Sequence, residues 1–279
     1  MMFASLSPAQ LSELACVGLA AGLVGGLLGV GGGLVMIPAM ALLLADAFGP
    51  GSFHLYKLAA IATSVVLSIP ATLRHVRAGA IMPDMLRSTL PLAVIGVAAG
   101  VALASSPLFV GGQTHNLRRV FGGFLELVVA VQVFQHVRAA RGEPSLVDCC
   151  PLPTRRLLHG LVVGLPTGVI AGFLGIGGGI WAVPAQSLLF GIRLRYAIAN
   201  SSLMIIFVAG ATVIVQSLAV SRMPGLSAGS AWWLTAVLAP TAIAGGWIGA
   251  GLTHRISTAW LRVAFNGLLA VTGVQLMRG

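Results

Sequence analysis

A glycine-rich apolar stretch near the start of the chain occurs again in its second half. Residues 22–39 read GLVGGLLGVGGGLVMIPA, and residues 168–185 read GVIAGFLGIGGGIWAVPA. In each copy a glycine triplet interrupts an apolar run, and a proline follows five residues after the triplet. A match this detailed indicates an internal duplication, so the fold must accommodate two related halves, each with a break in an apolar segment.

The duplication continues beyond the glycines. Residues 60–64 (AIATS) align with residues 197–201 (AIANS). Further matches follow at isolated positions: Pro91, Gly96, Gly100 and Leu103 align with Pro240, Gly245, Gly249 and Leu252, and Arg119 and Gln132 align with Arg262 and Gln275. The duplication is therefore supported along most of each half.

The apolar character of the chain predicts a membrane protein. Hydrophobic residues make up 57% of the sequence and charged residues 8%, whereas soluble domains are usually about a quarter charged. Apolar runs near the roughly 18 residues that a membrane-spanning helix needs recur throughout, at residues 14–30, 90–104, 120–137 and 198–220. The short alternating segments of a β-barrel are absent. We therefore expect an all-α polytopic membrane protein.

Five helical segments are expected in each half. The first transmembrane repeat covers residues 1–137, a hydrophilic cytoplasmic linker covers 138–156, and the second repeat covers 157–279. The expected segments lie at about 11–30, 34–48, 55–73, 86–103 and 117–137, then at 157–174, 180–190, 196–220, 232–252 and 261–277. In each half, the two segments that a glycine triplet separates form either two full membrane crossings or a re-entrant hairpin. In both cases the chain returns to the side of the membrane on which the first of the two segments began.

An odd number of segments makes the two repeats inverted in the membrane. Of the 16 Lys and Arg residues, eleven fall in the connections on one side and five, including Lys57, on the other. The richer side is expected to be cytoplasmic, with both termini outside. This bias also accounts for the net charge of +10, so no nucleic acid is expected as a partner. Three cysteines without metal-ligand spacing predict no metal site.

The two glycine triplets are the first candidate binding residues. Inverted repeats with broken helices indicate a secondary transporter with its site near the midplane of the bilayer. Glycine permits tight reversals and leaves backbone N–H groups uncovered, and a helix that starts there points its positive dipole end at the break. Two such ends facing each other would bind an anion. The predicted ligands are Gly31, Gly32, Gly33, Gly177, Gly178 and Gly179.

Close helix packing is the alternative role for these glycines, because small residues let membrane helices approach each other. Packing explains the glycines upstream of the triplets at least as well as a binding role does; these are Gly22, Gly26, Gly29, Gly168, Gly172 and Gly175. Two polar pairs at equivalent positions are the next candidates: Thr63 with Ser64, and Asn200 with Ser201. They either bind the oxygens of an anion or bond a neighbouring backbone carbonyl.

Four further polar residues are candidates for a gate or for coupling. His75 lies in a basic cluster after the third segment and forms either a solvated cytoplasmic edge or a gate. Glu126 is a carboxylate at membrane depth, which suggests a proton carrier or pairing with an arginine. Gln132 and Gln275 are matched amides near the ends of the last segment of each half. No catalytic constellation or nucleotide-binding motif is present, so neither an enzyme nor a cofactor is expected.

These residues resemble the sulfite exporter TauE/SafE family. The resemblance lies in GGLLGVGGG at residues 25–33, GFLGIGGG at residues 172–179, the proline after each, and the paired ATS and ANS. The loop at residues 75–81 is similar to that family's basic, glycine-containing loop, although Ala80 and residues 82–85 depart from its usual Asn-Val-Asp-Trp pattern. The resemblance implies a carrier of sulfur-containing anions such as sulfite, thiosulfate or organosulfonates in the bacterial inner membrane.

The main hypothesis is a secondary transporter that works by alternating access on a small sulfur-containing anion, in the lipid bilayer. A passive anion channel is the first alternative, and a membrane scaffold without substrate is the second. A homodimer is expected only because dimers are common among carriers.

Overall fold

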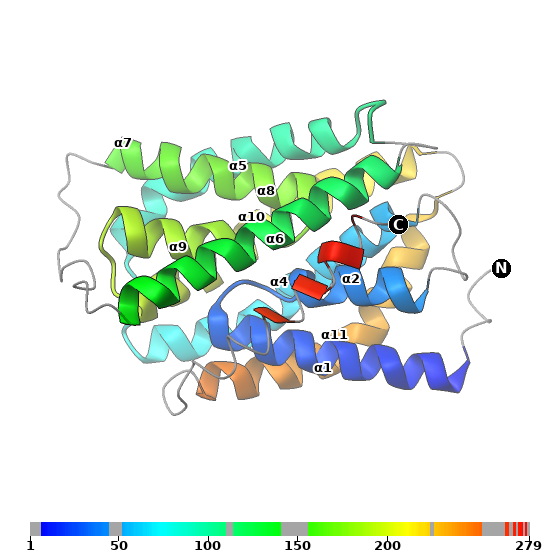
Figure 1. Cartoon of the computed structure of the whole chain (residues 1–279), viewed down its shortest axis with the longest axis horizontal. Coiled ribbons are helices and arrows are strands. Elements are labelled where there is room, and N and C mark those ends of the chain that lie inside the picture. Colours follow the sequence, from blue (N-terminus) through cyan, green and yellow to red (C-terminus); the bar gives the residue numbers. More distant parts are fainter. Residues whose placement is uncertain are drawn as a thin grey trace.

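The computed structural model describes residues 7–44, 52–109, 114–140, 156–223 and 226–252, together with 266–267, 270–271, 273–275 and 277. These residues are helical apart from short connections, and no strand occurs among them. In chain order the elements, shown in Figure 1, are α1 (Pro8–Leu28), α2 (Gly33–Leu43), α4 (Phe53–Arg77), α5 (Pro83–Ala104), α6 (Thr114–Ala140), α7 (Arg156–His159), the π-helix η3 (Gly160–Gly164), α8 (Leu165–Leu174), α9 (Gly179–Leu189), α10 (Leu194–Ser221) and α11 (Ala228–Leu252).

Six helical spans in the described residues are long and apolar enough to cross a membrane. They are Pro8–Leu28, Phe53–Arg77, Pro83–Ala104, Leu157–Leu174, Arg195–Ser221 and Ala228–Leu252. The predicted all-α polytopic membrane fold is confirmed. One placement matters for function: the charge count grouped Lys57 with the basic residues at one membrane side, whereas it lies in the second turn of α4, which begins at Phe53.

Glycines with positive φ values break the two helices at the places where the sequence predicts breaks. The helix α1 ends at Leu28 because Gly29 has φ 64° and Gly31 has φ 81°. The helix α8 ends at Leu174 in the same way, with φ values of 77°, 83° and 76° at residues 175, 177 and 178. A residue with a Cβ atom adopts positive φ values only at a steric cost, so the breaks require glycine.

The helices that follow the breaks are too short to cross a membrane. Both α2 and α9 have 11 residues, which at 1.5 Å per residue is about 16 Å, roughly half of a hydrocarbon core. In Figure 1, α2 runs back from the broken end of α1 towards the side on which α1 begins, and α9 runs back towards the side of α7. Each broken pair therefore has the course of a hairpin.

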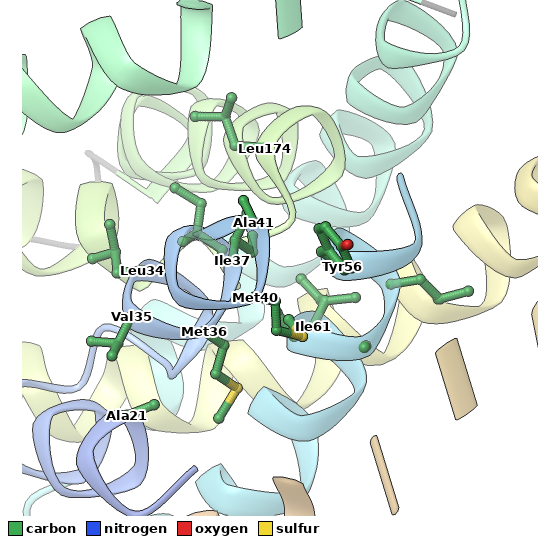
Figure 2. Close-up of a cluster of buried hydrophobic side chains, with 14 of the residues drawn as sticks. Ala21, Leu34, Val35, Met36, Ile37, Met40, Ala41, Tyr56, Ile61 and Leu174 are labelled. Carbon is green, nitrogen blue, oxygen red and sulfur yellow. The ribbon is translucent and has the colours of Figure 1, made fainter. Parts of the chain in front are cut away.

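Protein surrounds most of α2, although Leu42 near its end is exposed. Figure 2 shows its side chains Leu34, Ile37 and Met40 pointing in different directions around α2, with Leu174 of α8 and Tyr56 of α4 on two of its sides. These five side chains are at most 2% exposed. A backbone break at membrane depth needs this shielding, because an amide left unpaired in lipid costs several kcal/mol.

Glycines upstream of the breaks pack helices in two pairs. On α1, a Cβ atom added to Gly22 or Gly26 would lie within 3.0 Å of backbone carbonyl oxygens of α11. On α8, a Cβ atom added to Gly168 or Gly172 would lie as close to backbone carbonyl oxygens of α5. The partner helices pack in the same way. A Cβ atom added to Gly245 or Gly249 of α11 would meet backbone carbonyls of α1, and one added to Gly96 or Gly100 of α5 would meet carbonyls of α8. Close helix packing, one of the two alternatives that the sequence left open, is what the structure shows at these positions.

The tightest of these contacts gives a test of stability. Gly168→Ala would place a methyl group against the Ala93 carbonyl, whereas Gly210→Ala in α10 meets no atom within 4 Å. We expect Gly168→Ala to lower the unfolding free energy by about 1–3 kcal/mol, since overpacking forces the helices apart. Gly210→Ala should be neutral or slightly stabilising. Thermal unfolding in detergent measures both, and equal midpoints for the two variants would contradict the packing account.

Candidate functional site

The two glycine breaks meet inside the protein. A Cβ atom added to Gly33, the first residue of α2, would lie 2.8 Å from the nearest backbone atom of residues 175–176. A Cβ atom added to Gly179, the first residue of α9, would lie within 3.0 Å of the backbone of residues 29–30. Each short helix therefore begins against the break that precedes the other, and the contacts are reciprocal.

The meeting point brings two helix N-termini together. The first intrahelical bonds of α2 reach only Val35 and Met36, whose N–H groups donate to the Gly32 carbonyl at 3.1 and 3.0 Å. In α9 the N–H groups of Trp181 and Ala182 donate to the Gly178 carbonyl in the same way. The amides before these positions have no partner within their own helix, and the positive dipole ends converge on one place. All six triplet glycines are buried.

Two serines join the breaks to the long helices behind them. Ser64 of α4 accepts a hydrogen bond from the Gly32 N–H at 3.1 Å and donates to the Ala60 carbonyl at 2.8 Å. Ser201 of α10, at the equivalent sequence position, donates to the Gly29 carbonyl at 2.7 Å. Both serines are 0% exposed. The structure thus brings Ser64 and Ser201 together with the glycine triplets.

The residues before these serines point elsewhere. Thr63 donates to the Ala59 carbonyl of its own helix at 2.8 Å. The Asn200 side chain accepts from the Met82 N–H at 2.8 Å and donates to the Gln186 side chain at 3.1 Å. Neighbouring residues on a helix lie about 100° apart, so both members of a pair cannot face the breaks. Asn200 instead connects the loop after α4 to α9.

Sequence reasoning missed Gln186 and the role of Lys57. Gln186 of α9 is fully buried and has Met40 at the equivalent place in the first half, so the duplication gave no signal for it. Lys57 is also fully buried, and its Nζ donates to the carbonyl of Phe173 near the end of α8. A basic residue close to the start of an apolar segment was the only signal for Lys57.

The four gate or coupling candidates have different surroundings. His75 is 1% exposed near the end of α4, so it is not part of a solvated edge. Glu126 of α6 is half-buried, and in the described part of the chain its Oε1 has no hydrogen-bond partner and the carboxylate has no ion pair with an arginine. Gln275 is exposed. The side chain of Gln132 lies outside the described residues.

The chain is similar to a family of membrane transporters. The family model described as "Sulfite exporter TauE/SafE" matches residues 14–276. A probable membrane transporter protein of Sinorhizobium fredii, y4hK, is 28% identical over 242 residues, which cover 86% of this chain and 87% of the relative. A probable membrane transporter protein of Haemophilus influenzae is 26% identical over 267 residues, covering 93% and 95%.

A longer relative matches as well. The probable membrane transporter protein MamO of Paramagnetospirillum magneticum is 27% identical over 296 residues, covering 97% of this chain. This chain spans 45% of the length of that relative, which is therefore much longer. No solved structure matches the chain.

The serine that accepts the Gly32 amide allows a direct test of the site geometry. Ser64→Ala would leave a buried N–H group without its acceptor, and we expect a loss of about 1–3 kcal/mol of unfolding free energy. Ser202→Ala is the matched control, since that buried hydroxyl donates only to Ile198 of its own helix. Thermal unfolding compares the two variants. If Ser202→Ala destabilises the protein as much as Ser64→Ala does, the link between α4 and the break is not important.

Proposed function

The chain belongs to the sulfite exporter TauE/SafE family of membrane transporters, and we propose that it is a secondary transporter for a small sulfur-containing anion in the bacterial inner membrane. Sulfite, thiosulfate and organosulfonates are the substrate classes in question. The observation that carries this proposal is the reciprocal meeting of the two glycine breaks, where two helix N-termini converge.

An anion is the ligand that such a site favours. Backbone N–H groups and the positive ends of two helices attract negative charge, and buried donors act strongly because little water competes with them. The hydroxyl groups of Ser64 and Ser201 lie at the same breaks, and each would donate to an oxygen of the anion by giving up its present bond to the Ala60 or Gly29 carbonyl. Oxygen-rich anions such as sulfite and thiosulfate accept several hydrogen bonds at once, which suits a group of converging donors.

Alternating access agrees better with the geometry than a passive channel does. The triplets and both serines are buried, with side chains such as Met36 of α2 and Ile205 of α10 against the glycines. A carrier passes through such an occluded state, whereas an open anion channel needs a continuous wet path. In this proposal residues 1–137 and 157–279 are inverted repeats, joined by a cytoplasmic linker whose residues 141–155 lie outside the described part.

The scaffold alternative keeps one observation in its favour, because the triplets also pack tightly. Gly33 and Gly179 have no room for a methyl group. Gly177 is different: a methyl group there would lie 3.5 Å from its nearest neighbour, a side-chain carbon of Ile205. At Gly177, inside the second break, the positive φ of 83° requires glycine, whereas the space around it does not. No contact described here bears on the expected homodimer, which stays a prediction.

Ligand-induced stabilisation of the purified protein in detergent is the first test. We expect sulfite, thiosulfate or sulfoacetate to raise the unfolding temperature, and sulfate and chloride to have little effect. At one hundred times its dissociation constant, a ligand stabilises the folded state by about 2.7 kcal/mol. A folded protein that responds to none of the sulfur anions would overturn the substrate class. Saturable counterflow in proteoliposomes then separates a carrier from a channel.

A glycine variant tests whether the triplets contact the anion. Gly177→Ala adds a methyl group between the breaks, and we expect thiosulfate binding to weaken by roughly tenfold, which is about 1.4 kcal/mol. Gly79→Ala is the matched control, because Gly79 also has a positive φ (62°) and its added methyl group meets nothing within 4 Å. Both variants carry the same kind of backbone strain. Equal affinities in isothermal titration would favour a packing role for the triplets.

A further inference from the structure

One face of α4 is polar and buried along almost its whole length. Lys57, Ser64, Ser68 and His75 are 0%, 0%, 2% and 1% exposed. At 3.6 residues per turn, these four positions fall within about 40° of one another around the helix axis. From Lys57 to His75 the helix rises by 18 residue steps, or about 27 Å, which is close to the thickness of a hydrocarbon core. The face therefore extends from one side of the membrane region to the other inside the protein.

The equivalent helix of the second half has no such face. When residues 60–64 are aligned with 197–201, the positions of Lys57, Ser68 and His75 are occupied by Leu194, Ile205 and Thr212. The side chain of Ile205 lies close to both breaks, since it is among the nearest atoms to a Cβ added at residue 31 or 177. The two halves are thus unequal at this point, and the basic groups belong to α4 alone.

Lys57 lies directly against the second break. A Cβ atom added to Gly175 would lie 2.9 Å from the Lys57 Cβ. The lysine Nζ donates to the Phe173 carbonyl. This carbonyl is one of the last four of α8, which have no N–H partner within the helix. Ser64 follows two turns later on the same face, about 10 Å along the axis. Lys57 is therefore next to the second break, against which α2 begins.

The bonding of Lys57 is incomplete for a buried amine. A protonated lysine has three N–H donors, and the structure gives it one acceptor, the Phe173 carbonyl. Within the ranges that the structure describes, no carboxylate of Glu13, Asp84 or Glu126 forms an ion pair with it. A buried charge without a counter-charge is strongly unfavourable, and ionisable residues at membrane depth usually face a substrate path.

We propose that Lys57 provides the positive charge that binds the transported anion, and that the buried face of α4 from Lys57 to His75 forms one wall of its path. This inference rests on the proposed function and deepens it. The anion takes the place of the Phe173 carbonyl as acceptor for the Lys57 amine, so its arrival also releases the end of α8 from α4. Hydroxyl groups of Ser64 and Ser68 follow along the wall, and His75 stands at its other end.

Transport of radiolabelled thiosulfate into proteoliposomes tests the inference. Lys57→Met keeps the length and apolar stem of the side chain but removes its charge, and we expect the KM for thiosulfate to rise at least tenfold. Lys57→Arg, which keeps the charge, should change the KM much less. Arg119→Met is the control for the loss of one positive charge, because Arg119 is exposed on α6. It should transport like the unaltered protein.

A purely structural role for Lys57 gives a different result. If Lys57 only fastens α8 to α4, Lys57→Met lowers the unfolding temperature of the ligand-free protein. The rise in unfolding temperature on adding thiosulfate and the KM for thiosulfate would then stay unchanged, and this result would overturn the inference. If Lys57→Met does not fold, Ser68→Val on the same wall replaces it, with reduced thiosulfate flux expected and unchanged flux contradicting the path. Absence of saturable flux in the unaltered protein would instead overturn the proposed function itself.

Discussion

Backbone that leaves its helix at membrane depth must be enclosed by protein, and this constraint governs the whole arrangement. The chain leaves a helix twice at such depth, at residues 29–33 and 175–179. The two breaks shield each other, since each packs on the start of the opposite short helix. Long helices complete the enclosure, with Ser64 of α4 and Ser201 of α10 bonding to backbone groups that the breaks leave unpaired. The other amides in the first turns of α2 and α9, which have no partner within their own helix, make the meeting point suitable for an anion.

The sequence was sufficient to predict the fold because its strongest signals are local. Long apolar runs predict spans, and glycine triplets predict breaks, since few other residues adopt the positive φ values found there. Reciprocal contacts at the two breaks agree with the duplicated sequence, although the inverted orientation of the halves stays a prediction. The resemblance to the TauE/SafE family rests on the same glycines, and the family model confirms it over residues 14–276.

The site was predicted less well, because its details depend on which way each helix is turned. The sequence proposed both Thr63 and Ser64 as ligands, but a helix can turn only one of two neighbours towards the breaks. It counted Lys57 among the basic residues at one membrane side, and its position near the start of an expected segment did not reveal that α4 buries it. Gln186 has no equivalent in the first half, so a comparison of the halves could not identify it. These features depend on contacts between distant segments, which a single sequence does not contain.

The packing of the helices limits how such a carrier can move. The closest contacts, made through glycines, join α1 to α11 and α5 to α8, and these pairs lie along opposite edges of the molecule in Figure 1. Each pair combines one helix from each half of the sequence, so a rigid motion of one half against the other would separate both pairs. A motion of the α1–α11 pair against the α5–α8 pair keeps every one of these contacts. One glycine break follows α1 and the other follows α8, so this second motion acts directly on the place where the breaks meet.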